Sequence, residues 1–322
     1  MRGTHVVSIG NRRVRYRFNV RRNITIVRGD SGTGKTTLYD LVVAHMREGE
    51  NSRVQLSCDK QCVALTDFDW KHQLAGIADS IVFVDEGSRF VSSEEFAAAV
   101  LGTDNYYVVF SREPLHQLPY SVDEIYYIKT SGKYHSLEPM YKKRVRHVYG
   151  VTGTVRAAYQ TLLTEDSKSG YEFYKARFIG SDLTCVSAYT NSGIYPWLRQ
   201  HANERVFVIA DGAAFGSEAE RVLALQERHA NTITICLPES FEWLLLSSGL
   251  VGGAELGRIM RSPGDHIESQ RFASWEQYFT ALLTRESQGT AFAYSKGRLA
   301  SAWTIKENAD KVMAFVRNRN VK

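Results

Sequence analysis

The stretch that decides the fold runs from Gly29 to Thr37 and reads GDSGTGKTT. Its first eight residues match the pattern G-x-x-x-x-G-K-[ST] in full. A β-rich run, Asn23–Arg28, precedes the pattern, and we expect a helix from Lys35 to about Met46. Glycines in such a strand-to-helix turn let backbone N–H groups face an anion, because no Cβ stands in the way. The sequence therefore predicts a phosphate-binding loop in an α/β layer.

Each residue of this loop is expected to contribute to binding a nucleotide. Lys35 should reach the β- and γ-phosphates, and the Thr36 hydroxyl should ligate Mg²⁺. The N-terminus of the helix adds partial positive charge. The expected nucleotide-binding residues are Gly29, Asp30, Ser31, Gly32, Thr33, Gly34, Lys35, Thr36 and Thr37. The alternative is a glycine-rich turn with a chance lysine.

An acidic pair, Asp85 and Glu86, ends the continuous apolar run at 81–84. This element resembles a Walker B sequence, as the loop resembles Walker A, and together they place the chain near the P-loop ATPases. The resemblance implies that Asp85 holds Mg²⁺ through water and that Glu86 orients or deprotonates the attacking water. The alternative is an acidic pair that only solvates a loop.

Arg112 follows a buried strand predicted at 106–110. In a parallel sheet it would lie at the edge that binds the nucleotide, where it could contact the γ-phosphate. A plain surface arginine is the alternative, and Arg89 is a weaker candidate for the same role. The expected catalytic residues are thus Lys35, Glu86 and Arg112. No N/TKxD guanine-recognition motif is evident, so ATP is expected rather than GTP.

Alternating strands and helices fill both halves of the chain and predict an α/β fold. In the first half, strands are expected at 6–9 and 14–18, as a hairpin around Gly10 and Asn11, and at 53–56, 62–65, 80–84, 106–110 and 124–128. A helix is expected at 70–78, and the run Ser92–Glu95 resembles the capped start of another helix that continues through 97–101. In the second, strands are expected at 157–163, 184–189, 205–209 and 232–237, with helices at 171–177, 194–201 and 218–229. The predicted division is a P-loop parallel-sheet domain at 1–148, a second α/β domain at 149–245 and a helical C-terminal region at 246–322.

Carboxylates follow three predicted strands of the second domain. Glu165 follows the first strand and Asp211 the third, an order similar to that of a TOPRIM domain, whose second aspartate is replaced here by Ala213. The resemblance implies a divalent-metal site that includes Glu165 and Asp211. Glu218, or Glu239 and Glu242, would supply the missing ligand. A nuclease site, a degenerate site and a coincidental α/β layer all remain open.

A P-loop ATPase joined to a TOPRIM-like domain resembles the overcoming-lysogenization-defect nucleases. The elements GDSGTGKTT, VDEG, TEDSxSGYEF and DGAAFG also resemble those of poorly characterised bacterial P-loop proteins. The resemblance implies an ATPase that controls an Mg²⁺-dependent nuclease in phage defence. The alternative is a nucleotide-switched scaffold or regulatory protein with a degenerate second domain.

The composition argues against a membrane protein, a secreted protein and a disulfide-rich protein. The 322 residues are 43% hydrophobic with a net charge of +5, and no stretch approaches 18 uninterrupted apolar residues. No signal-peptide core is evident near the N-terminus, and the four cysteines are too few for a disulfide scaffold, so we expect a cytoplasmic protein without membrane contact. Cys58 and Cys62 are expected to be reduced thiols rather than metal ligands. Expected partners are ATP and either a nucleic acid, at the basic run 142–147, or another protein; an oligomer is left open.

Overall fold

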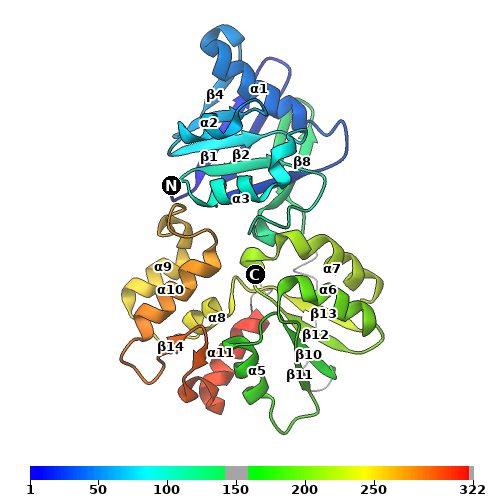
Figure 1. The fold of residues 1–322 in the computed structure, drawn as a ribbon, viewed down its shortest axis with the longest axis vertical. Coiled ribbons are helices and arrows are strands. Elements are labelled where there is room, and N and C mark those ends of the chain that lie inside the picture. The colour runs from blue at the N-terminus through cyan, green and yellow to red at the C-terminus, as the bar shows by residue number, and fades with distance from the viewer. Residues whose placement is uncertain (142–158, 319–322) are drawn as a thin grey trace. The chain divides into compact units, whose positions relative to one another are not determined.

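The computed structural model describes residues 1–141 and 159–318, and Figure 1 shows the chain as a ribbon. It forms two compact units. Unit 1 comprises Met1–Met140 and Ser262–Ser274, and unit 2 comprises Tyr141–Arg261 and Trp275–Lys322. The predicted domain boundary and the basic run at 142–147 lie outside the described residues. Within the described part, no helix has the length and apolar character needed to cross a membrane.

Unit 1 is built on a nine-stranded mixed sheet, most of whose strand pairs are parallel. Its strands, in spatial order, are β4 (Gln55–Ser57), β1 (His5–Gly10), β2 (Arg15–Val20), β9 (Tyr134–Pro139), β8 (Ile125–Ser131), β3 (Ile24–Arg28), β7 (Tyr106–Phe110), β6 (Ser80–Val84) and β5 (Gln61–Leu65). Each pair of neighbouring strands from β8 across to β5 is parallel, and so is the pair of β2 with β9. β1 pairs antiparallel with β2 and with β4, and β8 pairs antiparallel with β9. The predicted α/β class and the predicted hairpin are confirmed.

The burial of the strands follows their hydrophobic pattern. Residues of β2 alternate between exposed and buried, as expected for a strand with one face on the core. All residues of β6 and β7 are buried, as expected for strands covered on both faces. β9 was not predicted, because its sequence YHSLEP is mostly polar. In the structure, most of its residues are half-buried.

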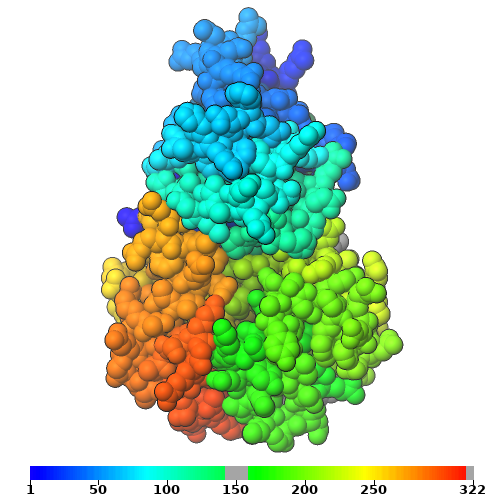
Figure 2. Space-filling view, viewed as in Figure 1, coloured from blue at the N-terminus to red at the C-terminus, as the bar shows by residue number. Residues whose placement is uncertain are grey.

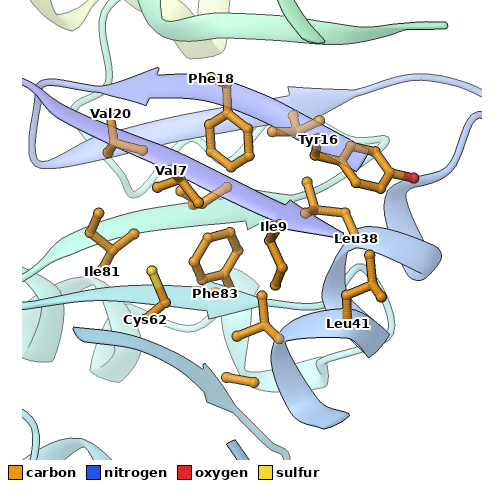
Figure 3. Close-up of a cluster of buried hydrophobic side chains, with 14 of the residues drawn as sticks. Val7, Ile9, Tyr16, Phe18, Val20, Leu38, Leu41, Cys62, Ile81 and Phe83 are labelled. Atoms are coloured by element: carbon orange, nitrogen blue, oxygen red, sulfur yellow. The ribbon is translucent and has the colours of Figure 1, made fainter. Parts of the chain in front are cut away.

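The helices of unit 1 are α1 (Lys35–Glu48), α2 (Trp70–Ala75) and α3 (Glu94–Leu101). The predicted cap of α3 is confirmed, because the Ser93 hydroxyl accepts a hydrogen bond from the Phe96 N–H. Figure 3 shows how α1 joins the core: Leu38 and Leu41 face Ile9 of the hairpin and Phe83 of β6. This packing holds the start of α1, and with it the glycine-rich loop, against the sheet.

Residues 262–274 join unit 1 through polar contacts with the N-terminal segment. The Met1 ammonium pairs with Glu268 and donates to the Ser269 hydroxyl at 2.9 Å. The Asn23 side-chain amide donates to the backbone carbonyls of Ser269 and Phe272, at 3.2 and 2.9 Å. The helical region predicted at 246–322 is therefore divided between the two units.

Unit 2 contains a four-stranded parallel sheet in the order β11 (Thr184–Ser187), β10 (Thr161–Thr164), β12 (Val206–Ile209) and β13 (Ile233–Cys236). Its helices are α5 (Ser169–Arg177), α6 (Asn191–Gln200), α7 (Gly216–Arg228), α8 (Phe241–Ser247), α9 (Ala254–Arg261), α10 (Trp275–Ser287) and α11 (Lys306–Asn318). A small hairpin, β14 (Tyr294–Ser295) and β15 (Arg298–Leu299), was not predicted. α5 packs against α11, and their green and red surfaces adjoin in Figure 2.

The strand order of unit 2 creates a switch point between β10 and β12. The chain leaves β10 toward β11 on one side and returns to β12 on the other. In open α/β sheets, the crevice at such a point, outside the carboxyl ends of the strands, is where ligands bind. Glu165 and Asp211 follow the two strands that flank this crevice.

Candidate functional site

The loop of unit 1 depends on glycine for its backbone shape. Gly32 and Gly34 have φ values of +82° and +98°, in the left-handed region that L side chains rarely adopt. A Cβ on Gly34 would lie 2.7 Å from the Tyr16 hydroxyl. That hydroxyl donates to the Gly34 carbonyl at 3.0 Å, so β2 supports the loop directly before α1 begins.

Lys35 is buried under this loop. Its ammonium contacts the Gly29 carbonyl and donates to the Asp30 carbonyl at 3.1 Å. It also pairs with Glu86, with 3.2 Å between Lys35 Nζ and Glu86 Oε2. The lysine of the loop and the acid after β6, which are far apart in the sequence, therefore meet in the fold.

Sheet order explains how Arg112 reaches the same place. β7 lies between β3 and β6, so the segments that follow these three parallel strands share one edge. Arg112 Nε lies 2.5 Å from Glu86 Oε1. The Glu86 carboxylate thus bridges Lys35 and Arg112, the two cations that were predicted to contact phosphate. Arg89 is exposed at the start of a short 3₁₀ helix after β6.

Asp85 and Thr36, at this edge of the sheet, carry oxygen groups of the kinds that bind Mg²⁺. Asp85 Oδ1 is a buried carboxylate oxygen with no hydrogen-bond partner among the described residues. Carboxylate and hydroxyl oxygens are the hard donors that Mg²⁺ prefers. Thr36, the other expected ligand, is exposed at the start of α1. Burial raises the pKa of Tyr39 in α1 to about 12, and the negative charge of Asp85 adds to this.

In unit 2, the two carboxylates predicted as metal ligands lie side by side. Glu165 Oε2 accepts a hydrogen bond from the Asp211 backbone N–H at 2.8 Å. Asp211 Oδ1 accepts one from the Phe241 N–H at 2.9 Å, at the start of α8. Burial raises the pKa of Glu165 to about 7, and burial and the charge of Glu165 raise that of Asp211. Backbone N–H groups thus orient both of these half-buried carboxylates.

Both carboxylates line a pocket at the switch point. Its polar and charged lining comprises Thr164, Glu165, Asp166, Ser167, Lys168, Tyr174, Tyr189, Asp211, Glu242, Glu276, Tyr294 and Lys296. Glu242, one of the three acids considered as a further ligand, is among them and accepts a hydrogen bond from the Tyr294 hydroxyl at 2.6 Å. Glu218 instead pairs with Arg221.

Glu276, Lys296 and Tyr174 were not predicted from the sequence as members of this pocket. Glu276 lies in the first turn of α10, and Lys296 lies in the turn between β14 and β15. No motif marks these positions. Ala213, where a TOPRIM domain would have its second aspartate, is buried in a short 3₁₀ turn. Over the residues that the structure describes, no three His, Cys, Asp or Glu side chains are arranged to hold a metal ion.

No family model, curated protein or solved structure shows significant similarity to the chain. The function is therefore inferred from the residues of the two sites.

Proposed function

We propose that unit 1 binds ATP together with Mg²⁺ and hydrolyses it. The observation that carries this proposal is the Glu86 carboxylate between Lys35 and Arg112, next to the glycine-rich loop. Lys35 and the backbone N–H groups of residues 29–37 would hold the phosphates, and Thr36 and Asp85 would hold the ion. Bound Mg²⁺ neutralises charge that develops on the phosphates.

The same geometry supports the following order of events at the side chains. The γ-phosphate is an anion, so it competes with Glu86 for the ammonium of Lys35 and the guanidinium of Arg112. Glu86 then loses its cationic partners. A carboxylate in that state is a better acceptor for a proton from an attacking water. After phosphate leaves, Glu86 returns to Lys35.

The decisive experiment is equilibrium binding of ATP, with Mg²⁺, to a Lys35→Ala variant of the full chain. Losing a charge-assisted hydrogen bond costs about 1.5–3 kcal/mol, so we expect binding to weaken by roughly 10- to 150-fold. Lys71→Ala, at an exposed position of α2, is the matched control and should bind as the parent does. Equal affinity of Lys35→Ala and parent would rule out this site. Competition by GTP tests the expected preference for ATP.

For unit 2, we propose Mg²⁺-dependent cleavage of a phosphodiester, controlled by the nucleotide state of unit 1 and suited to defence against phage. Its support is the adjacency of Glu165 and Asp211 at the switch point. Ala213 favours a second candidate, a nucleotide-switched scaffold that binds a partner without cleavage.

A cleavage assay separates these two candidates for unit 2. The full chain is incubated with single- and double-stranded DNA and RNA, with Mn²⁺ or Mg²⁺ and with or without ATP. The nuclease predicts cleavage that a Glu165→Gln, Asp211→Asn double variant loses. The scaffold predicts no cleavage under any condition by parent or variant.

A further inference from the structure

A lysine lies inside the acidic pocket of unit 2. The Lys296 ammonium donates to Glu276 Oε1 at 2.8 Å. The side chain of Glu276 is 19% exposed, whereas that of Lys296 is 57% exposed. The lysine thus reaches a largely buried carboxylate from the solvent side of the pocket.

Glu276 lines the same pocket as the two carboxylates at the switch point. After burial, its negative charge is among the causes that raise the pKa values of both Glu165 and Asp211. Burial lowers the pKa of Lys296, but its hydrogen bond with Glu276 and the negative charges of Glu276, Glu242 and Asp211 raise it above its usual value. Several negative charges therefore lie in one region, and the Lys296 ammonium offsets part of them.

Tyr174 gives an independent sign that the pocket receives a ligand. Its side chain is only 2% exposed and lines the pocket. Its hydroxyl is buried and has no hydrogen-bond partner among the described residues. Buried hydroxyls normally have a partner, so this group is available to a ligand oxygen, such as a water bound to a cation.

The carboxylates keep oxygens that the protein does not use in these bonds. Glu165 uses Oε2 and Asp211 uses Oδ1 to accept backbone N–H groups, while Glu276 uses Oε1 to bind Lys296. Mg²⁺ and Mn²⁺ prefer oxygen ligands, and negative charge in the ligand set increases affinity. Asp85 in unit 1 is separate from this set.

We propose that Glu276 supplies the third carboxylate, in place of the aspartate that Ala213 replaces, and completes a divalent-cation site with Glu165 and Asp211. Lys296 is the resident counter-ion of Glu276, and an arriving cation displaces its ammonium. Over the described residues, no three His, Cys, Asp or Glu side chains stand ready to hold a metal ion, so the site would form only as Glu276 leaves Lys296 and turns toward the cation. It rests on the cation chemistry proposed for unit 2 and adds the third ligand and the competitor.

The experiment uses the full chain with Asp85→Asn in every sample, which removes the expected ion ligand of unit 1, and no nucleotide. Mn²⁺ alone is the probe, and its binding is measured by the loss of the free-ion electron paramagnetic resonance signal. Glu276→Gln should weaken binding at least tenfold, because a charged ligand is lost. Glu172→Gln, at an exposed position of α5 outside the pocket, should not change it.

Lys296→Met supplies the opposite test, since a misfolded variant would not bind Mn²⁺ more tightly. Removing one positive charge beside the site should strengthen binding about fivefold or more. Lys168→Met removes another lysine of the same pocket that is not bonded to Glu276, and it should have a smaller effect. Weaker binding by Lys296→Met would overturn the role of Lys296 as a displaced counter-ion.

The carboxylate variants distinguish the failure of this inference from the failure of the underlying site. Unchanged binding by Glu276→Gln, with loss in Glu165→Gln, Asp211→Asn, would leave a cation site and overturn the role of Glu276. Unchanged binding by all of them would overturn cation binding in unit 2 altogether. Either result leaves the ATP-binding test of unit 1 unaffected.

Discussion

Glu86→Gln should have opposite effects on the binding and the hydrolysis of ATP. In the absence of nucleotide, Glu86 lies 3.2 Å from the ammonium of Lys35. Two unit charges at that distance attract by about 1.3 kcal/mol in water and about 5 kcal/mol at an effective dielectric constant of 20. The Lys35 side chain is 5% exposed and that of Glu86 is 24% exposed, so the pair lies between these limits.

The change in affinity is smaller than the full attraction. A glutamine can still accept a hydrogen bond from Lys35, and the exposed Arg112 pair contributes only about 0–1 kcal/mol. We therefore expect ATP to bind more tightly by about 1–2 kcal/mol, or about 5- to 30-fold. Hydrolysis should slow by about 10²–10⁴, because the variant lacks the base.

Two assays on the same protein test this pair of effects: equilibrium binding of ATP with Mg²⁺, and single-turnover hydrolysis. Glu113→Gln removes an exposed acid next to Arg112 and is the matched control, with parent-like behaviour expected in both assays. Unchanged or weaker ATP binding by Glu86→Gln would refute the competition between Glu86 and phosphate. Single-turnover hydrolysis at the parent rate would refute the role of Glu86 as a base.

Two further predictions concern groups outside the proposed sites. Glu124 is fully buried, accepts a hydrogen bond from Arg21 Nε at 2.8 Å and forms an ion pair with Arg22, whose Nε lies 3.2 Å from Glu124 Oε1. Glu124→Ala should therefore lower the stability of unit 1 by about 3–5 kcal/mol. A shift below about 1 kcal/mol in urea unfolding would contradict this. A hydrogen bond with Cys62 lowers the pKa of Cys58 to about 7, so the rate of alkylation by iodoacetamide should rise through that pH as the thiolate forms. In Cys62→Ala the rise should move to higher pH, and an unchanged pH profile would count against this hydrogen bond.

The positions of the candidate residues in unit 1 could be predicted because these residues directly follow strands that the sequence reveals. The loop is a single uninterrupted motif after β3, and Asp85 directly follows the apolar run of β6. Parallel strands place their carboxyl ends at one edge, so Arg112 could be placed there before the structure was known. The pairing of Glu86 with both cations could not be predicted, because it depends on side-chain geometry.

The pocket of unit 2 could be predicted only in part. Glu165 and Asp211 follow strong strand signals, and the sheet brings them together. Glu276 and Lys296 reach the pocket from the C-terminal part of the chain, and β14 and β15 have only two residues each. Two-residue strands have no periodicity to read, so neither the hairpin nor its lysine could be placed by pattern.

The two sites share a lysine–carboxylate pair but differ in how readily it opens. Lys35 is nearly buried, and a buried ammonium that loses Glu86 without a replacement is strongly disfavoured. Its pair should therefore open only as phosphate arrives, so that release of the base is tied to nucleotide binding. Lys296 is more than half exposed, and water can solvate it once Glu276 is taken. Opening of the second pair therefore costs less, and Lys296 should weaken cation binding only moderately, by about fivefold or somewhat more.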